Sequence, residues 1–149
     1  MIKKQAVPLK SQKRKSRLLY TLTGIVKRHP DGFGFLIPED PQHPDVYLSQ
    51  RQMQHLMNND KVNISVLPRK HRKGLFEGKI LKILQRAQDH VVGEYFPLSN
   101  KKGLISDNSY QWGEDLKIQL KENQKLKKGE WVQAKVLFWP GSPQGFKGE

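Results

Sequence analysis

Landmark residues recur along this chain at a nearly constant spacing, and this repetition constrains the fold more than any other feature of the sequence. Two glycines recur with a shift of 69 positions, and three short segments recur with a shift of 70. The paired landmarks are Gly24 and Gly93, Gly34 and Gly103, 45–48 and 115–118, 60–62 and 130–132, and 76–78 and 146–148. A common shift over separate landmarks indicates duplication. The chain of 149 residues therefore contains two tandem copies of one small unit.

The first copy has the pattern of an all-β barrel. Ser49 is placed to cap a short helix that runs to about position 57. Alternating or β-branched segments predict strands at 20–28, 33–37, 45–49, 60–66 and 75–84. Five short strands, with the long connection after the third, are typical of a five-stranded OB-fold barrel. We therefore expect an all-β protein made of two tandem OB barrels.

The repeat also gives the domain boundaries. We expect a first barrel at 18–85 and a second barrel at 90–149, with the junction near 85–89. The second copy reaches position 149 only four residues into its fifth strand, where the first copy has a strand of about ten residues. We therefore expect an incomplete last strand, a weakly closed second barrel, and a natural protein that continues beyond Glu149.

Three aromatic residues are predicted to share one outer face of the first barrel. Successive side chains of a strand point to opposite faces, so Phe33 and Phe35 lie on the same side. Between them, Gly34 leaves the opposite face open, and Asp31-Gly32 is a two-residue hairpin signal. Tyr47 points away from its apolar neighbours in the next strand. Exposed rings in this arrangement favour stacking of unpaired bases, the alternative being that one ring belongs to the core.

The charge balance favours a polyanionic partner. Lys and Arg number 27 against 14 Asp and Glu, which gives a formal net charge of +13 and a pI near 10.0. Nucleic acid is the commonest partner of such chains, and an anionic membrane surface is the rival. We expect phosphate contacts from a flexible basic arm at 1–17, from the first strand end and turn, and from the loop 68–74. The candidate residues outside the arm are Lys27, Arg28, His29, Arg69, Lys70, Arg72 and Lys73. For the arm and the loop, the alternative is a solvated basic segment.

The second copy lacks the aromatic face. Its counterparts of Phe33, Phe35 and Tyr47 are Lys102, Leu104 and Lys117. Trp112 has no clear assignment. For Trp131 and Trp139 we expect core packing or contact with the first barrel, although at least one of them could be exposed.

No catalytic constellation is visible in the sequence. Hydrolysis with two metal ions needs carboxylates that converge, whereas the acidic residues here are scattered. Glu39 and Asp40 flank a proline-rich loop, and the five histidines lack metal-ligand spacing. Cysteine is absent, so disulfides and thiolate sites are excluded. No apolar run approaches the roughly 18 residues that span a bilayer, and no signal-peptide pattern opens the chain. We expect a soluble cytoplasmic protein that binds no membrane.

Several motifs resemble known families. The segments 24–27, 32–35 and 45–48 resemble the cold-shock domain with its two aromatic motifs. A closer resemblance is to the N-terminal region of RNase R and RNase II exoribonucleases, in which two cold-shock-like domains precede the nuclease domain. The runs GFGFLIPED, DVYLS, NDKV and VGEYF carry this resemblance, which covers about residues 20–149.

The resemblance implies a function that the residues alone do not give. In that family, the nuclease domain hydrolyses RNA from the 3′ end with a divalent metal, expected to be magnesium, held by clustered aspartates. The two barrels would hold single-stranded RNA and guide it to a nuclease domain absent from this chain. We expect a monomer, with no cofactor in this chain. The alternatives are a self-standing cold-shock-like RNA chaperone and a protein-interaction scaffold.

Overall fold

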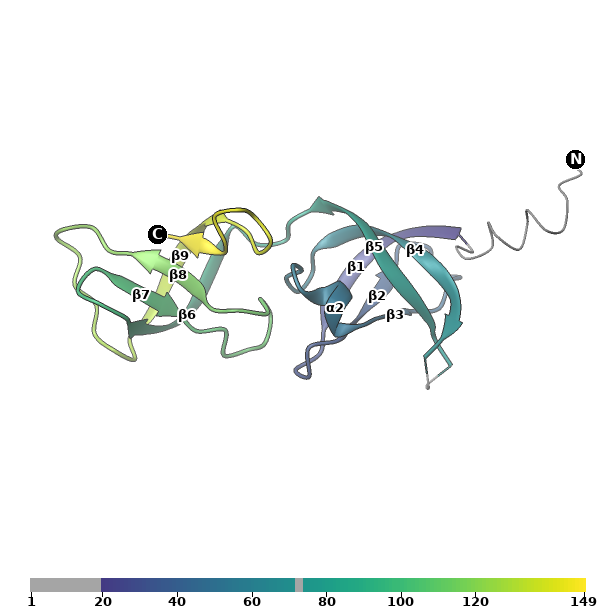
Figure 1. Cartoon of the computed structure of the whole chain (residues 1–149), viewed down its shortest axis with the longest axis horizontal. Coiled ribbons are helices and arrows are strands. Elements are labelled where there is room, and N and C mark those ends of the chain that lie inside the picture. Colours follow the sequence, from purple (N-terminus) through teal and green to yellow (C-terminus); the bar gives the residue numbers. More distant parts are fainter. Residues whose placement is uncertain (1–19, 72–73) are drawn as a thin grey trace, which may run out of the picture.

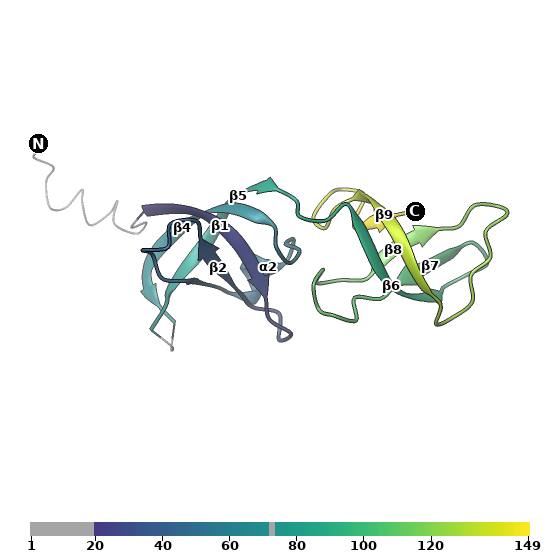
Figure 2. The same ribbon diagram turned by 180° about the vertical axis from the view of Figure 1, so that it is seen from behind.

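A computed structural model describes residues 20–71 and 74–149, and it contains two closed five-stranded β-barrels that lie side by side along the long axis of the molecule (Figure 1). One stretch of chain passes from the first barrel to the second, as the opposite view also shows (Figure 2). The predicted fold class of two tandem OB barrels is confirmed. The predicted basic arm at 1–17 lies outside the described residues.

The first barrel is formed by β1 (Tyr20–Arg28), β2 (Gly34–Pro38), β3 (Val46–Leu48), β4 (Lys61–Lys70) and β5 (Phe76–Gln85). β1 pairs antiparallel with both β2 and β4. β3 pairs parallel with β5, which closes the barrel in the order β1-β2-β3-β5-β4. The predicted strands coincide with these except at their ends and in β4.

Glycines set how closely the strands of the barrel approach one another. A Cβ on Gly24 would lie 2.3 Å from the carbonyl oxygen of Ile37, and one on Gly34 would lie 2.7 Å from the sulfur of Met53. The inner face at Gly34 is therefore filled by Met53, not open as the sequence suggested. Their counterparts in the second barrel are equally crowded, because a Cβ on Gly103 would lie 2.3 Å from the Tyr95 ring. This crowding explains why the glycine landmarks recur.

One short helix, α2 (Gln50–Met53), covers the end of the first barrel. Ser49 caps it as predicted, since its hydroxyl accepts a hydrogen bond of 3.4 Å from the backbone N–H of Gln52. The helix ends at Met53, earlier than the predicted end near position 57. Met53 and Leu56 are fully buried in the first core, whereas Met57 is buried in the second.

β4 continues further than its sequence pattern indicated. The segment Pro68–Lys70 was expected to begin a basic loop, but it extends β4 up to the pairing of Lys70 with Phe76. The ladder shifts register between Val66 and Lys70, which accommodates Pro68 on the exposed part of the strand. The remaining turn is closed by hydrogen bonds from His71 N–H to the carbonyl of Leu75 and from Gly74 N–H to the carbonyl of His71.

The second barrel repeats this layout with β6 (His90–Pro97), β7 (Lys102–Ile105), β8 (Leu116–Gln119), β9 (Trp131–Phe138) and β10 (Lys147–Gly148). β10 has only two residues, yet it pairs parallel with β8 and antiparallel with β9 and so closes the barrel. The expected short last strand is present, but the barrel is closed.

The three tryptophans take different places in the second barrel. Trp112 is buried in the core with its ring edge against Phe146, and Trp139 packs partly buried against the same core. Trp131 is 63% exposed on β9, so the expectation of a buried or interface role for it was wrong. The reason is strand alternation, which turns Trp131 away from the inward-facing Ala134 and Val136.

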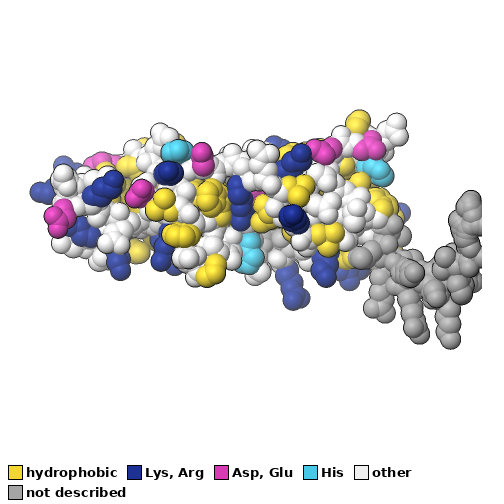
Figure 3. Space-filling model, turned by 90° about the horizontal axis from the view of Figure 1, so that it is seen from above, with side chains coloured by type: hydrophobic (Ala, Val, Ile, Leu, Met, Phe, Trp, Pro, Cys, Tyr) yellow, Lys and Arg dark blue, Asp and Glu magenta, His cyan; other side chains and the backbone are white. Residues whose placement is uncertain are grey.

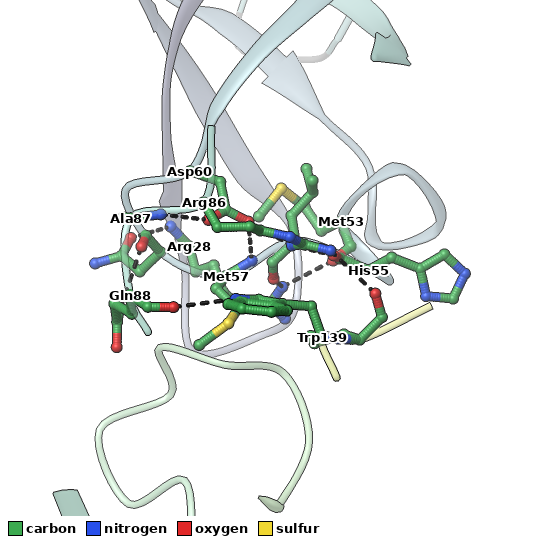
Figure 4. A network of polar contacts seen from close by, with 12 residues as sticks. Arg28, Met53, His55, Met57, Asp60, Arg86, Ala87, Gln88 and Trp139 are labelled. Atoms are coloured by element: carbon green, nitrogen blue, oxygen red, sulfur yellow. Dashed lines mark hydrogen bonds and ion pairs between the residues drawn. The ribbon is translucent and has the colours of Figure 1, made fainter. Parts of the chain in front are cut away.

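A network of polar contacts joins the two barrels (Figure 4). The carboxylate of Asp60, fully buried, accepts hydrogen bonds from the backbone of Met57 (2.8 Å) and Ala87 (3.1 Å) and from Arg86 Nη1 (2.7 Å). Arg86 also donates to the carbonyl of Pro140 in the second barrel, at 3.1 Å. One arginine therefore connects the first core to a loop of the second barrel.

Further contacts reinforce this joint. The Trp139 ring nitrogen donates to the carbonyl of Gln88 at 3.0 Å, and Asn58 N–H donates to the carbonyl of Gln111 at 2.6 Å. Met57, from the segment after α2, is buried in the second core. The linker is thus held in place by hydrogen bonds and by a shared apolar contact.

Candidate single-strand nucleic-acid interface

The register of the first barrel aligns three candidate residues in one row across neighbouring strands. Lys27 of β1 is opposite Phe35 of β2, and Phe35 is opposite Tyr47 of β3. Directly paired residues point to the same face, so these three side chains are neighbours on the outer surface. Phe33, two positions before Phe35, lies on the same face. The sequence prediction that these residues share a face is consistent with this arrangement.

Five rings form a continuous cluster, here called the aromatic surface, made of His29, Phe33, Phe35, Tyr47 and His71. The Phe33 and Phe35 centroids are 5.6 Å apart with perpendicular planes, and the Tyr47 centroid lies 5.7 Å from Phe33 and 6.2 Å from Phe35. The three central rings are half-buried, so part of each remains accessible. Mutual edge contacts of this kind hold rings in fixed orientations.

The two histidines stack on the outer members of the cluster. His29 lies parallel to Phe33 with centroids 4.2 Å apart, and His71 lies parallel to Tyr47 at 3.9 Å. Their imidazoles lengthen the row of flat surfaces at both ends. His29 is among the residues predicted to contact RNA, whereas His71 is not. Only the folded β4–β5 turn brings His71 over Tyr47.

The turn between β1 and β2 supports the His29 end. Gly32 has a φ of 98°, and its N–H donates to the carbonyl of His29 at 2.9 Å. His29 N–H donates to the carbonyl of Phe33, so three residues lie between the closing pair, not the two that the Asp31-Gly32 signal suggested. Asp31 N–H donates to His29 Nδ1 at 3.1 Å, which helps to orient the imidazole over Phe33.

Lys27 and Arg28 face different environments. Lys27 is exposed beside Phe35, and its ammonium group donates to the side-chain carbonyl of Asn59. Arg28 has the parity of the inward-facing Val26, and its Nη1 donates to the carbonyls of Met53 (2.8 Å) and Leu56 (2.7 Å). Burial lowers the pKa of the Arg28 guanidinium, an effect that the charges of Asp107 and Asp60 oppose.

Arg28 therefore does not join the aromatic surface, in contrast to the sequence prediction. Its guanidinium donates a hydrogen bond to the backbone carbonyl of Met53 at the end of α2. Its Nε is buried without a hydrogen-bond partner among the described residues. Strand alternation explains the difference, since only one of two consecutive residues can lie on the outer face.

The basic candidates of the β4–β5 region are partly engaged. Arg69 Nε lies 3.3 Å from a carboxylate oxygen of Glu77, and Lys70 Nζ lies 5.2 Å from the centroid of the Phe76 ring. Glu77 is opposite Tyr47, so the Arg69–Glu77 pair lies at the margin of the aromatic surface. Arg72 and Lys73 lie outside the described residues.

Neighbouring apolar residues extend the same face. Ile37 is 41% exposed and is opposite Ile25 on β1, two positions along the ladder from the Lys27–Phe35 pair and on the same face. These isoleucines were not among the predicted site residues, although the two-residue spacing between Phe35 and Ile37 already places both side chains on one face of the strand. Side chains of this kind widen the apolar floor on which a base could rest.

The described residues show neither a metal centre nor a membrane span. Among residues 20–71 and 74–149, no group of three or more His, Asp or Glu side chains is arranged to hold a metal ion. Within the same ranges, no helix has the length and apolarity needed to cross a bilayer. We derive no hydrolytic step from these residues.

Comparisons with known proteins point to one family. The family model described as "Ribonuclease B OB domain" matches residues 24–83, which is most of the first barrel. Ribonuclease R of Acidithiobacillus ferrooxidans is 42% identical over 73 residues, which make up 49% of this chain and 16% of that protein. The chain thus spans less than a fifth of the length of this relative.

Two solved structures share the fold over nearly the whole chain. RNase R of Mycoplasma genitalium in complex with ribose-methylated single-stranded RNA has a TM-score of 0.69 and 17% identity, covering 86% of this chain and 20% of that one. Yeast Ssd1, described as a pseudonuclease, has a TM-score of 0.64 and 14% identity, covering 95% of this chain and 24% of that one. The sequence matches therefore identify the first barrel as an OB domain of the ribonuclease R family, and the two solved structures show that the fold is shared over nearly the whole chain.

Proposed function

We propose that this chain binds single-stranded RNA with little sequence preference and that the aromatic surface stacks its bases. The alignment of Lys27, Phe35 and Tyr47 across three strands carries the proposal, because it places a cation beside two accessible rings. Aromatic stacking contributes about 1–3 kcal/mol per base and accepts any base, while the cation attracts the phosphate.

The likeness to RNase R extends the proposal to the whole protein. The two barrels would hold single-stranded RNA and guide it to a nuclease domain of the same polypeptide, which would degrade the strand from its 3′ end with a divalent metal, expected to be magnesium. We propose a cytoplasmic, monomeric protein. The Mycoplasma relative, solved with single-stranded RNA, supports this substrate class. The Ssd1 likeness shows that the same architecture also occurs in a pseudonuclease, so nuclease activity has to be tested separately.

The charge distribution agrees with a polyanionic ligand. Lys and Arg side chains are spread over both barrels in the view of Figure 3. The formal net charge of the chain is +13. Such a field accelerates association with nucleic acid and makes affinity depend steeply on salt.

A comparison of single-stranded with double-stranded RNA tests the proposal. A fluorescently labelled RNA of about 20 nucleotides is titrated with the protein in two forms, as the single strand and annealed to its complement, at equal ionic strength. We expect at least about tenfold tighter binding of the single strand, because bases paired in a duplex are not available to the aromatic surface. Equal affinity for both forms would show that charge alone holds the RNA and would contradict the stacking assignment.

A further inference from the structure

A groove on the outer side of the second barrel is lined by three lysines from three strands. Lys102 of β7, Lys117 of β8 and Lys147 of β10 border it, and its volume is about 390 Å³. Lys147 is directly opposite Lys117 in the parallel β8–β10 pair, so their side chains point to the same face. Leu137 and Phe138 of β9 supply apolar lining.

The positive charge of this groove is not neutralised within the described residues. No Asp or Glu is among its lining residues, and none of the three lysines makes an ion pair or side-chain hydrogen bond with another described residue. Lys102 and Lys117 are exposed on their strands, as is Lys147. Clustered ammonium groups repel one another, and an anion that bridges them removes this repulsion.

The groove occupies the place of the aromatic surface in the duplicated fold. With the shift of 69 or 70 positions, Lys102 corresponds to Phe33, Lys117 to Tyr47, and Lys147 to Glu77. Two rings and a carboxylate of the first barrel are thus replaced by three ammonium groups in the second. The same outer face has therefore exchanged flat surfaces for point charges.

We propose that this lysine groove is a phosphate-binding subsite that holds the backbone of the same single-stranded RNA, while the first barrel stacks its bases. The inference rests on the proposed function. Lysine suits this role because its ammonium is a compact charge that attracts phosphate without reading a base. The two barrels would then divide the work, the first supplying base contacts and the second supplying salt-dependent phosphate contacts.

The salt dependence of binding measures this division. For single-stranded nucleic acid, each neutralised phosphate adds about 0.7 to the negative slope of log affinity against log salt concentration, so three lysines contribute about 2.1. The wild type should bind RNA more tightly than a variant without these lysines, and the ratio of the two affinities should fall about 18-fold when the salt concentration rises from 50 to 200 mM. Base stacking adds little to this slope.

The experiment compares two triple variants with equal change in charge. Lys102→Gln/Lys117→Gln/Lys147→Gln removes the groove lysines, and Lys121→Gln/Lys125→Gln/Lys128→Gln removes three exposed lysines of the β8–β9 loop. Affinity for a labelled single-stranded RNA of about 20 nucleotides is measured by anisotropy at several salt concentrations. Circular dichroism confirms that each variant is folded. We expect the slope to fall by about 2 in the groove variant and by less than 1 in the loop variant.

The outcomes separate this inference from the proposed function. Equal slopes in the two triple variants would overturn the phosphate subsite, even if the wild type binds RNA as proposed. If Phe33→Ala/Phe35→Ala leaves affinity unchanged while the groove variant loses slope, the stacking role fails and the lysine groove stands. A groove that instead accepts an acidic protein would leave the RNA slope unchanged, which also counts against the inference.

Discussion

Replacing Arg86 with methionine should weaken the whole molecule by uncoupling its two barrels. Arg86 donates to Asp60 in the first barrel at 2.7 Å and to the carbonyl of Pro140 in the second at 3.1 Å. Methionine keeps much of the apolar stem but leaves the Asp60 carboxylate, which is fully buried, without its cation. Breaking one partner of a buried ion pair costs about 3–5 kcal/mol. We expect about 3 kcal/mol, because two backbone N–H groups still donate to Asp60 and the Arg86 side chain is 20% exposed.

Urea unfolding followed by two probes tests this prediction. All three tryptophans lie in the second barrel, so their fluorescence reports on that barrel, whereas far-ultraviolet circular dichroism reports on both. In the wild type the two transitions should coincide. In Arg86→Met they should separate, with a lower stability for at least one barrel. Arg51→Met is the matched control, because Arg51 is exposed on α2 and makes no hydrogen bond or ion pair with another described residue.

The reasoning would be refuted by a loss below about 1 kcal/mol with coincident transitions, the same result as for Arg51→Met. Such an outcome would mean that the polar network does not couple the barrels and that the apolar contact of Met57 suffices.

Three further predictions concern the first barrel. Gly34→Ala should lower the free energy of unfolding by about 1–3 kcal/mol, because its Cβ would lie 2.7 Å from the Met53 sulfur; unchanged urea unfolding would contradict the packing described. Lys27→Gln should reduce the salt slope of RNA binding by about 0.7, whereas Arg28→Gln should reduce stability and leave the slope intact; a slope change in the Arg28 variant would return that residue to the interface. Ser49→Ala should cost about 0.5 kcal/mol in thermal or urea unfolding, near the low end for an N-cap since its hydrogen bond is 3.4 Å long, and a loss above about 2 kcal/mol would require another role for the hydroxyl.

Much of the fold could be predicted from the sequence, because it depends on the alternation of inward and outward side chains along each strand and on close-packed glycines. β1 runs over the predicted residues Tyr20–Arg28, a segment rich in β-branched residues in which burial alternates from Leu22 to Val26. The recurring glycines were recognisable as landmarks, and the structure gives the reason, namely backbone and side-chain atoms that leave no space for a Cβ. The shared face of Phe33 and Phe35 followed from the two-residue period of a strand.

Other features depend on contacts between segments distant in sequence. His71 joins the aromatic surface only because the β4–β5 turn folds over Tyr47, which no local pattern encodes. The closure of the second barrel by the two-residue β10 depends on pairing with both β8 and β9. The inward position of Arg28 was available from its parity with Val26, but its charge and its position beside Lys27 favoured an outward assignment. Contacts between distant segments therefore account for the His71 and β10 differences, and the alternation of side chains along β1 accounts for the Arg28 difference.

The most direct test of the base-stacking claim compares wild-type chain, Phe33→Ala/Phe35→Ala and Trp131→Ala in anisotropy titrations with labelled single-stranded RNA at two salt concentrations. Trp131 is an exposed aromatic residue outside the aromatic surface, so its variant controls for loss of a ring. The account predicts a loss of about 2–5 kcal/mol in the double variant, or about 30-fold to 4,000-fold in affinity, with the salt slope preserved and the Trp131 variant unchanged. Equal binding by the wild type and the double variant would contradict it and would leave charge as the only force holding the RNA.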